Sequence, residues 1–249
     1  MSEAVARVEV VVAHDERATL RAGDVFLKVD GDSARTGREV EAMATAPLPT
    51  AEVLWHEPPV LALAAVRGRP LASLGEPSTS PPAAWVAAGA AVRRLHDAPP
   101  PPWDSSRRHP SASHLDDECE RLVADGVLPP DLIARNREVA TAVFRPHSPA
   151  FIHGDLQVDH VFVDGDEVTG VLDWSEAGQG DPLYDLATLT LGHEEHLDDV
   201  LVGYGTGADL DVVRGWWSLR SLVGIRWLLA HGFDPFLPGC EVDVLRARM

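Results

Sequence analysis

The chain has 249 residues, and its 21 lysines and arginines against 39 aspartates and glutamates give a net charge of −18. This excess of carboxylates excludes a nucleic-acid binder, because a phosphate backbone requires a basic face, and the 45% hydrophobic content excludes a disordered chain. The length allows one large domain or two small lobes. An acidic surface suits a cationic small substrate, although solubility alone also explains it.

Location and membrane association follow from what the sequence contains. The two cysteines, Cys119 and Cys240, lie far apart and predict neither a disulfide framework nor a zinc cluster, so a reducing cytoplasm is the expected compartment. Apolar runs stay well below the roughly 20 residues that cross a bilayer. The N-terminal twenty residues lack a basic segment followed by an apolar core, and we therefore predict no signal peptide and no membrane partner.

Short segments rich in β-branched and aliphatic residues predict strands in the first part of the chain. They lie at 8–12, 24–29 and 60–63, with turn residues between them. Residues 37–44 carry apolar side chains at helical spacing, and Pro47 follows as a stop. We therefore predict a small β-rich lobe with one helix over residues 1–66. Such a lobe buries little area alone and has to dock on the rest of the chain.

Helices dominate the prediction for residues 67–249. They are expected at 83–95, about 112–125, about 130–143 and about 209–231. The four prolines at 99–102 end the first of these regions, because proline has no amide donor and clashes with the preceding turn. The last helix has a broad apolar face, and its tryptophans Trp216, Trp217 and Trp227 are predicted to be core residues rather than a ligand platform.

A predicted hairpin brings several candidate ligands together between residues 151 and 174. Its strand-like segments, 161–163 and 168–172, flank a turn, and pairing of Val163 with Val168 would place residues opposite each other when their numbers sum to about 331. The hairpin therefore returns Asp173 to the loop that holds the other candidates: His153, Asp155 and His160. Like charges gathered in this way repel unless a cation or substrate compensates them. His153-Gly154-Asp155 alone is more typical of a turn, and only the hairpin and the spacing to His160 and Asp173 favour a functional site.

This segment resembles the aminoglycoside phosphotransferase family, a branch of the protein-kinase-like fold. His153-Gly154-Asp155, followed five residues later by His160, is similar to the catalytic loop of the family, and Val171-Leu172-Asp173-Trp174 is similar to its metal-binding segment. Residues 180–187 are similar to the start of the helix that follows, and Phe26-Leu27-Lys28 fits the small lobe. The resemblance covers about residues 20–230 and implies a two-lobed α+β fold, with a small β-rich lobe and a larger, mainly helical one.

The resemblance also implies an activity, the transfer of the γ-phosphoryl group of ATP or GTP to a hydroxyl of a small molecule. Asp155 would be the catalytic base, and Asp173 and His160 would hold Mg²⁺. These residue types suit the reaction, because the proton of the nucleophile goes to a positioned carboxylate while magnesium neutralises phosphate charge. Asp181 and Asp185 are expected to cap a helix and to brace the loop.

Nucleotide contacts are implied in the small lobe. Lys28 would hold the α- and β-phosphates, and Glu39 on the following helix would pair with it. Glu41 competes with Glu39 for this partnership, and a lysine on a strand is also typical of a solvated edge. The hinge near Ala64 and Val66 would receive the purine through backbone groups.

Two departures from the family pattern bear on these expectations. The family usually has asparagine where His160 stands, and a histidine binds a cation only when it is neutral. The macrolide-modifying branch also carries histidine there, which makes that branch a candidate. The loop that covers the phosphates would fall at about His14 to Gly23, and Gly23 is the only glycine in it.

The predicted function is thus a small-molecule kinase with a small, cationic acceptor, namely an aminoglycoside-like or macrolide antibiotic or a related metabolite. The sequence also leaves three alternatives open. One is a metabolic kinase of the same fold that acts on an amino alcohol or a sugar. Another is a non-catalytic, pseudokinase-like nucleotide-binding module. The third is a metal-dependent hydrolase with His153, Asp155, His160 and Asp173 as ligands. The sequence does not fix the oligomeric state.

Overall fold

The N-terminal part of the chain forms a five-stranded antiparallel sheet in the order β1-β2-β3-β5-β4. A computed structural model describes residues 7–14, 16–105, 110–205 and 207–247. The strands are β1 (Val8–His14), β2 (Arg17–Ala22), β3 (Val25–Asp30), β4 (Val53–Glu57) and β5 (Val60–Ala64). The three predicted strands are confirmed with ends shifted by one or two residues, and β2 and β4 are additional to the prediction.

Most of the segment from His14 to Gly23, expected to be a phosphate-covering loop, is a strand. Residues 17–22 of that segment form β2, and His14 pairs with Arg17, so the turn between β1 and β2 holds only positions 15 and 16. Position 15 lies outside the described residues. The two arginines in the β2 sequence Arg-Ala-Thr-Leu-Arg-Ala mask the apolar alternation by which a strand is normally found.

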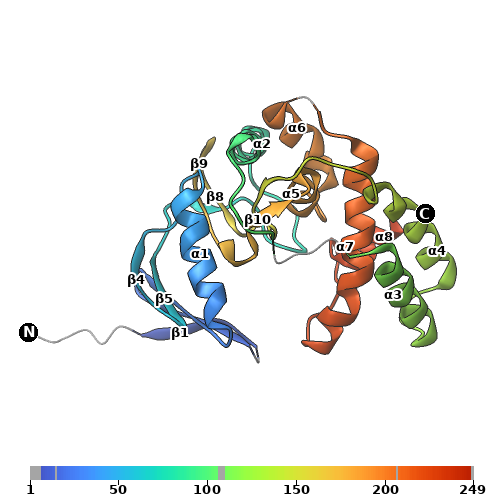
Figure 1. The fold of residues 1–249 in the computed structure, drawn as a ribbon, viewed down its shortest axis with the longest axis horizontal. Helices are drawn as coiled ribbons and strands as arrows, with labels where there is room; N and C mark the ends of the chain where they lie inside the picture. The colour runs from blue at the N-terminus through green and yellow to red at the C-terminus, as the bar shows by residue number, and fades with distance from the viewer. Residues whose placement is uncertain (1–6, 15, 106–109, 206, 248–249) are drawn as a thin grey trace, which may run out of the picture.

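Helix α1 (Ser33–Thr45) joins β3 to β4 and lies along one face of the sheet (Figure 1). Its N-terminus is capped by Asp32, whose side chain accepts a hydrogen bond from the amide of Ala34 over 3.0 Å. Glu39, Ala42 and Met43 are on its buried face. The predicted helix at 37–44 is therefore confirmed and begins one turn earlier, at the cap.

The rest of the chain is mainly helical and packs beside the sheet (Figure 1). The helices are α2 (Pro82–Asp97), α3 (Ala112–Ala124), α4 (Pro130–Ala140), α5 (Pro182–Leu189), α6 (Leu197–Tyr204), α7 (Leu210–Ala230) and α8 (Glu241–Arg246), with short 3₁₀ turns η1 (Thr141–Val143), η2 (Trp174–Glu176) and η3 (Glu194–His196). Two small sheets complete it, β6 (Arg69–Pro70) with β8 (Val161–Asp164) and β9 (Glu167–Val171), and β7 (Ala150–Ile152) with β10 (Gly178–Gly180). The α+β architecture expected from the sequence is confirmed.

The β8–β9 hairpin has the predicted register near its turn. Val163 pairs with Val168, and a bulge between Phe162 and Val163 then shifts the pairing by one residue. Past the strands, the amide of Leu172 donates to the carbonyl of His160 over 2.9 Å. The hairpin therefore returns the chain to the loop that precedes β8.

Helix α7 supplies much of the core of the helical part. Trp216 and Trp217 are buried, as predicted for this apolar face. Trp227 is 50% exposed, however, so the prediction that it is a core residue is wrong. It lies in the last turn and a half of the helix, which extends past the core. No helix within the described residues is long and apolar enough to cross a membrane.

Candidate active site

An ion pair between Lys28 and Glu39 joins β3 to α1. Nζ of Lys28 lies 2.5 Å from Oε1 of Glu39, and Glu39 is buried. The strand and helix are consecutive in the chain, so short-range geometry is enough to bring the two together. Glu41, the competing carboxylate, is exposed on the outer face of α1.

Asp173, which is 145 positions from Lys28 in the chain, contacts this pair. Its Oδ1 lies 3.2 Å from Nζ of Lys28, and among the described residues it is the one non-glycine residue with a positive φ, at 63°. Backbone strain of this kind is concentrated at functional sites. Burial raises the pKa of Asp173, but the cationic Lys28, with His160 and Arg17, outweighs burial and holds the pKa well below its usual range. Asp173 is therefore a carboxylate at neutral pH.

Lys28 is charged for the same reason. Burial lowers its pKa, but Asp173 and Glu39 together outweigh burial and raise the pKa above its ordinary value. An ammonium group held between two carboxylates is a fixed positive charge that is suited to bind a further anion.

His160 has its Nδ1 hydrogen bonded to the backbone carbonyl of Asp155 over 2.8 Å, and its Nε2 lies 3.9 Å from Oδ2 of Asp173. A carbonyl only accepts, so Nδ1 carries the proton and Nε2 of the neutral ring has a free lone pair. Burial lowers the pKa of His160, but the carboxylates of Asp173 and Asp155 outweigh it and raise the pKa above 6.5.

The donor set at His160 and Asp173 fits a cation that also has ligands from a substrate. Within the described residues there is no group of three or more His, Cys, Asp or Glu side chains that could hold a metal ion alone. Mg²⁺ commonly binds one or two carboxylates and completes its shell with water and substrate phosphates. A cation at Asp173 therefore fits if a phosphorylated ligand accompanies it.

The His153-Gly154-Asp155 loop is held by a buried carboxylate on α5. Asp185 accepts hydrogen bonds from the amides of His153 and Gly154, over 2.7 and 3.0 Å, and from Nε2 of His96 over 3.2 Å. Gly154 has φ +82°, and a Cβ there would lie 2.4 Å from the carbonyl oxygen of Glu176. The motif therefore needs glycine at this position, and Asp185 braces the loop as the sequence predicts.

His153 is a structural residue with both ring nitrogens engaged. Nε2 donates to the carbonyl of Leu172 over 2.9 Å, and Nδ1 accepts from the amide of Asp155 over 3.3 Å. Burial lowers its pKa, which keeps the ring neutral. A ring with both nitrogens used cannot bind a metal, and this observation opposes the hydrolase alternative.

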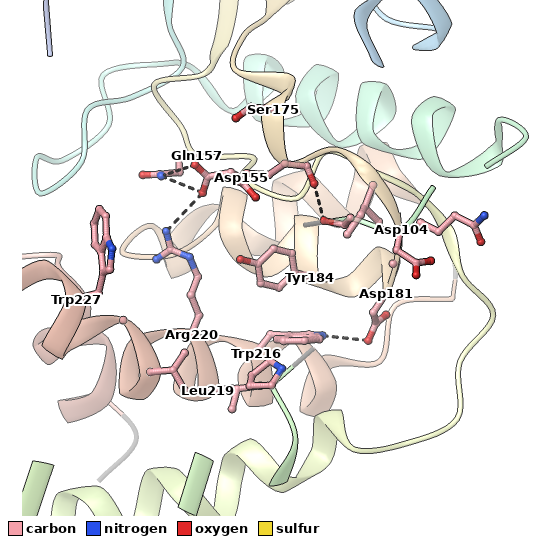
Figure 2. A pocket seen from close by; sticks show the side chains of 18 of the residues that line it. Asp104, Asp155, Gln157, Ser175, Asp181, Tyr184, Trp216, Leu219, Arg220 and Trp227 are labelled. Carbon is pink, nitrogen blue, oxygen red and sulfur yellow. Dashed lines mark hydrogen bonds and ion pairs between the residues drawn. The ribbon is translucent and has the colours of Figure 1, made fainter. Parts of the chain in front are cut away.

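The carboxylate of Asp155 faces a cavity of about 1120 Å³ (Figure 2). Nε2 of Gln157 donates to both of its oxygens, over 3.1 Å each. Arg220 of α7 approaches from the other side, with NH2 3.9 Å from Oδ1 of Asp155 and NH1 3.3 Å from Oε1 of Glu241. Asp155 is thus held between an amide and a guanidinium. Arg220 lies 65 positions away in the chain, and no local pattern predicts its approach.

The cavity is lined by acidic and aromatic side chains. Six carboxylates line it against three arginines: Glu16, Asp104, Asp155, Glu176, Asp181 and Glu241 against Arg17, Arg35 and Arg220. Tyr184, Trp216 and Trp227 contribute aromatic surface from α5 and α7 (Figure 2). Asp181 is occupied structurally, because it caps α5 at the amide of Leu183 and accepts from Nε1 of Trp216. Such a lining suits a positively charged ligand with some apolar surface.

The expected hinge follows the last strand of the sheet. Ala64 ends β5, and its amide donates to the carbonyl of Glu52 over 2.9 Å. Val66 lies against Gly170 of β9, where a Cβ would meet its side chain at 2.4 Å. Both residues thus lie where the sheet passes into the helical part.

Arg17 is, like Arg220, a site residue that the sequence does not reveal. It reaches from β2 to Asp173 and Ser175, more than 150 positions away. An isolated arginine beside a turn carries no sequence signal, and only the docking of the sheet on the loop after β9 brings it to the site.

Comparison with known proteins identifies relatives for most of the chain. A family model described as the phosphotransferase enzyme family, abbreviated APH, matches residues 13–220. Viomycin phosphotransferase of Streptomyces vinaceus is 35% identical over 96 residues. That alignment covers 34% of this chain and 33% of the relative, so it spans about a third of the curated protein.

Solved structures share the fold over nearly the whole chain. A macrolide 2'-phosphotransferase of type I superposes with a TM-score of 0.69 at 17% identity, covering 95% of this chain and 90% of its own. A choline/ethanolamine kinase family protein from Mesorhizobium loti gives 0.68 at 19% identity, covering 99% and 87%. Other phosphotransferases of this fold are described as complexes with ADP, with ATP or with GDP.

Proposed function

Because the chain belongs to the phosphotransferase enzyme family, we propose that it transfers the γ-phosphoryl group of ATP or GTP to a hydroxyl of a small, cationic acceptor. One observation carries the proposal: Lys28 bridges Glu39 and Asp173, with Nζ 2.5 and 3.2 Å from their oxygens. This triad joins the consecutive elements β3 and α1 to the distant segment at Asp173. Arg17 and Ser175, which are hydrogen bonded to Asp173, line the same cavity as Asp155. Since ATP and GTP are cytoplasmic metabolites, the proposal also places the protein in the cytoplasm.

The nucleotide would bind between the small lobe, residues 1–66, and the remainder of the chain, residues 67–249. Lys28, positioned by Glu39, would hold phosphate oxygens, and backbone groups of the hinge from Ala64 to Val66 would receive the purine. Family members with bound ADP, ATP or GDP support a nucleotide donor.

Asp173 and His160 would hold Mg²⁺, which when bound supplies positive charge against the phosphate oxygens. Asp173 contributes an anionic oxygen, and His160 contributes the lone pair of Nε2. The carbonyl of Asp155 fixes the tautomer that this requires. The same hydrogen bond ties the histidine to the loop of the proposed base.

Asp155 would act as the base. Its carboxylate faces the cavity. An acceptor hydroxyl placed there would give its proton to one carboxylate oxygen as its O–P bond forms, while the bond from the γ-phosphorus to the β–γ bridging oxygen breaks and ADP or GDP leaves. Gln157 and Arg220 hold the carboxylate in one orientation. Orientation matters because most of the catalysis in phosphoryl transfer comes from positioning and electrostatics.

The acidic lining of the cavity supports a cationic acceptor, and the names of the relatives suggest its class. Viomycin and macrolides are the acceptors named for two of them, and choline and ethanolamine are named for a third. We favour an antibiotic acceptor, because a cavity of about 1120 Å³ has room for a larger molecule and Tyr184, Trp216 and Trp227 offer it apolar contact. Phosphorylation of an antibiotic would confer resistance.

The test is magnesium-dependent release of ADP or GDP with a panel of viomycin, an aminoglycoside, a macrolide, choline and ethanolamine. Stimulation by an antibiotic that disappears in Asp155→Ala supports the proposal. Stimulation by choline or ethanolamine alone would favour the amino-alcohol kinase. Nucleotide binding without turnover on any acceptor would favour the non-catalytic module.

A further inference from the structure

Arg17 holds the position from which a phosphate-covering loop would normally act. It is the first residue of β2, directly after the two-residue turn, and it lines the cavity together with Ser175 and Asp155. The turn sequence Asp15-Glu16 contains no glycine. A glycine-rich loop binds phosphates through a row of backbone amides, and this connection carries two acidic residues in place of glycines.

Asp30 holds the Nε end of the Arg17 guanidinium, and the NH1 and NH2 end faces the proposed site. Nε donates to Oδ2 of the buried Asp30 over 3.2 Å. NH1 donates to both oxygens of Asp173, over 3.3 and 3.1 Å, and NH2 donates to Oγ of Ser175 over 2.7 Å. Asp30 therefore holds the arginine, whereas the other contacts are made by groups at the proposed nucleotide site.

The charges around Asp173 leave Arg17 available for another anion. Lys28 already neutralises Asp173 and is itself shared with Glu39. In the proposed function Asp173 is a metal ligand, and a cation bound there would take over the carboxylate oxygens that now accept from Arg17. Asp30 would still hold Nε and Ser175 would still accept from NH2, so the freed NH1 group would remain beside the phosphates that accompany the metal.

We propose that the side chain of Arg17 binds the phosphate oxygens of the nucleotide, next to a connection between β1 and β2 that contains no glycine. This inference rests on the proposed function. A guanidinium suits the role because its parallel N–H groups match two phosphate oxygens. Its hydrogen bonds to Asp173 keep the side chain beside the proposed site.

A blocking role for Arg17 predicts a change in nucleotide affinity in the opposite direction. If Arg17 only blocked the site by occupying Asp173, its removal would expose the carboxylate and tighten binding of a magnesium nucleotide. A phosphate ligand gives weaker binding on removal, and the loss is confined to ligands with phosphates. Adenosine, which has the base and the sugar alone, separates this loss from damage to the rest of the pocket.

The experiment is calorimetric titration of the full chain with Mg–ADP, Mg–GDP, adenosine and guanosine, in wild type, Arg17→Met and Arg17→Lys. Arg21→Met is the matched control, because Arg21 is on the same strand but is exposed, with Nε bonded to the carbonyl of Gly23. Asp30 keeps the amide of Asp32 and Arg35 as partners in every variant, so the fold should survive, and circular dichroism checks this.

Whichever of Mg–ADP and Mg–GDP the wild type binds, we expect its affinity to fall about tenfold or more in Arg17→Met, as for loss of a charge-assisted hydrogen bond. Affinity for the nucleoside should stay the same, Arg17→Lys should fall between, and Arg21→Met should match wild type. Unchanged or tighter diphosphate binding in Arg17→Met would overturn the inference and leave the proposed function standing. Wild-type protein that binds neither diphosphate would overturn both.

Discussion

Nδ1 of His160 donates to the backbone carbonyl of Asp155 over 2.8 Å, and this contact directs Nε2 toward Asp173, 3.9 Å away. The loop of the proposed base thus sets the tautomer of the proposed metal ligand. A histidine can replace an amide ligand only if the correct nitrogen is free of its proton. The hydrogen bond meets that condition in the neutral ring.

Protons should compete with magnesium at His160. Its raised pKa means that Nε2 is protonated at a higher pH than in an ordinary histidine. The magnesium concentration that gives half the maximal rate should therefore rise steeply as the pH falls from about 8 to about 6. His160→Asn has no such proton and should show a flatter dependence. Magnesium titrations of the initial rate at both pH values measure this. If the magnesium requirement of wild type and of His160→Asn changed equally with pH, His160 would not be a magnesium ligand.

In the metal-free protein, protonation of His160 should stabilise the fold, whereas it should weaken magnesium binding. The folded-state pKa of His160 lies above its unfolded value, so its contribution is fully present below about pH 6.5 and is lost as pH rises through the folded pKa. The stability gap between wild type and His160→Asn should therefore narrow from about pH 6 to about pH 8. Urea unfolding in the presence of a chelator measures it, and a gap that widens would rule out the raised pKa.

Removal of Lys28 should damage both stability and turnover. Lys28→Met leaves Glu39 buried without its cation, and we expect a loss of about 3 kcal/mol in the free energy of unfolding. The double variant Lys28→Met/Glu39→Gln removes the stranded charge and should recover much of that stability without recovering turnover. Turnover should fall on the order of a hundredfold or more in both. If the double variant is no more stable than the single one, the pair does not hold the site together.

Asp185 should control the stability of the catalytic loop. Asp185→Ala leaves three buried donors without an acceptor, namely the two loop amides and Nε2 of His96, and we expect a loss on the order of 3 kcal/mol. Asp185→Asn retains one carbonyl oxygen and should lose less. Urea unfolding ranks the three proteins, and hydrogen exchange at His153 and Gly154 should rise in the same order. Unchanged exchange at these amides would show that the loop does not depend on Asp185.

Trp227 should contribute to acceptor binding and not to nucleotide binding. It is half exposed and lines the cavity, so Trp227→Ala should raise the KM for the acceptor about tenfold, equivalent to about 1.4 kcal/mol, and leave the KM for nucleotide unchanged. Leu229→Ala is the control, because Leu229 is similarly exposed on α7 but does not line the cavity. Equal effects of the two substitutions would remove Trp227 from the acceptor site.

Local geometry explains why the centre of the site could be predicted. His160 and Asp173 belong to one hairpin, and its register differs from the predicted one only through the bulge after Phe162. Lys28 and Glu39 lie on consecutive elements, β3 and α1, which pack together. In both cases the residues approach through contacts that are short in sequence.

Residues brought in by long-range packing could not be predicted. Arg220 and Trp227 reach the cavity because α7 packs against α5, and the periodicity of α7 shows only that it is amphipathic. That pattern led to the wrong assignment of Trp227 to the core. Arg17 was hidden in a strand whose polar residues resemble a loop, and its role depends on the docking of the sheet on the segment at Asp173.

Phosphoryl transfer with Asp155 as base is tested by following labelled γ-phosphate in a single turnover, with enzyme in excess over labelled ATP or GTP and an acceptor present. We expect label on the acceptor with wild-type protein, and transfer reduced on the order of a hundredfold or more in Asp155→Asn, with nucleotide affinity unchanged. Equal transfer by Asp155→Asn would contradict the role of Asp155 as base. Label released only as free phosphate in the presence of every acceptor of the panel would contradict the assignment of a phosphotransferase site.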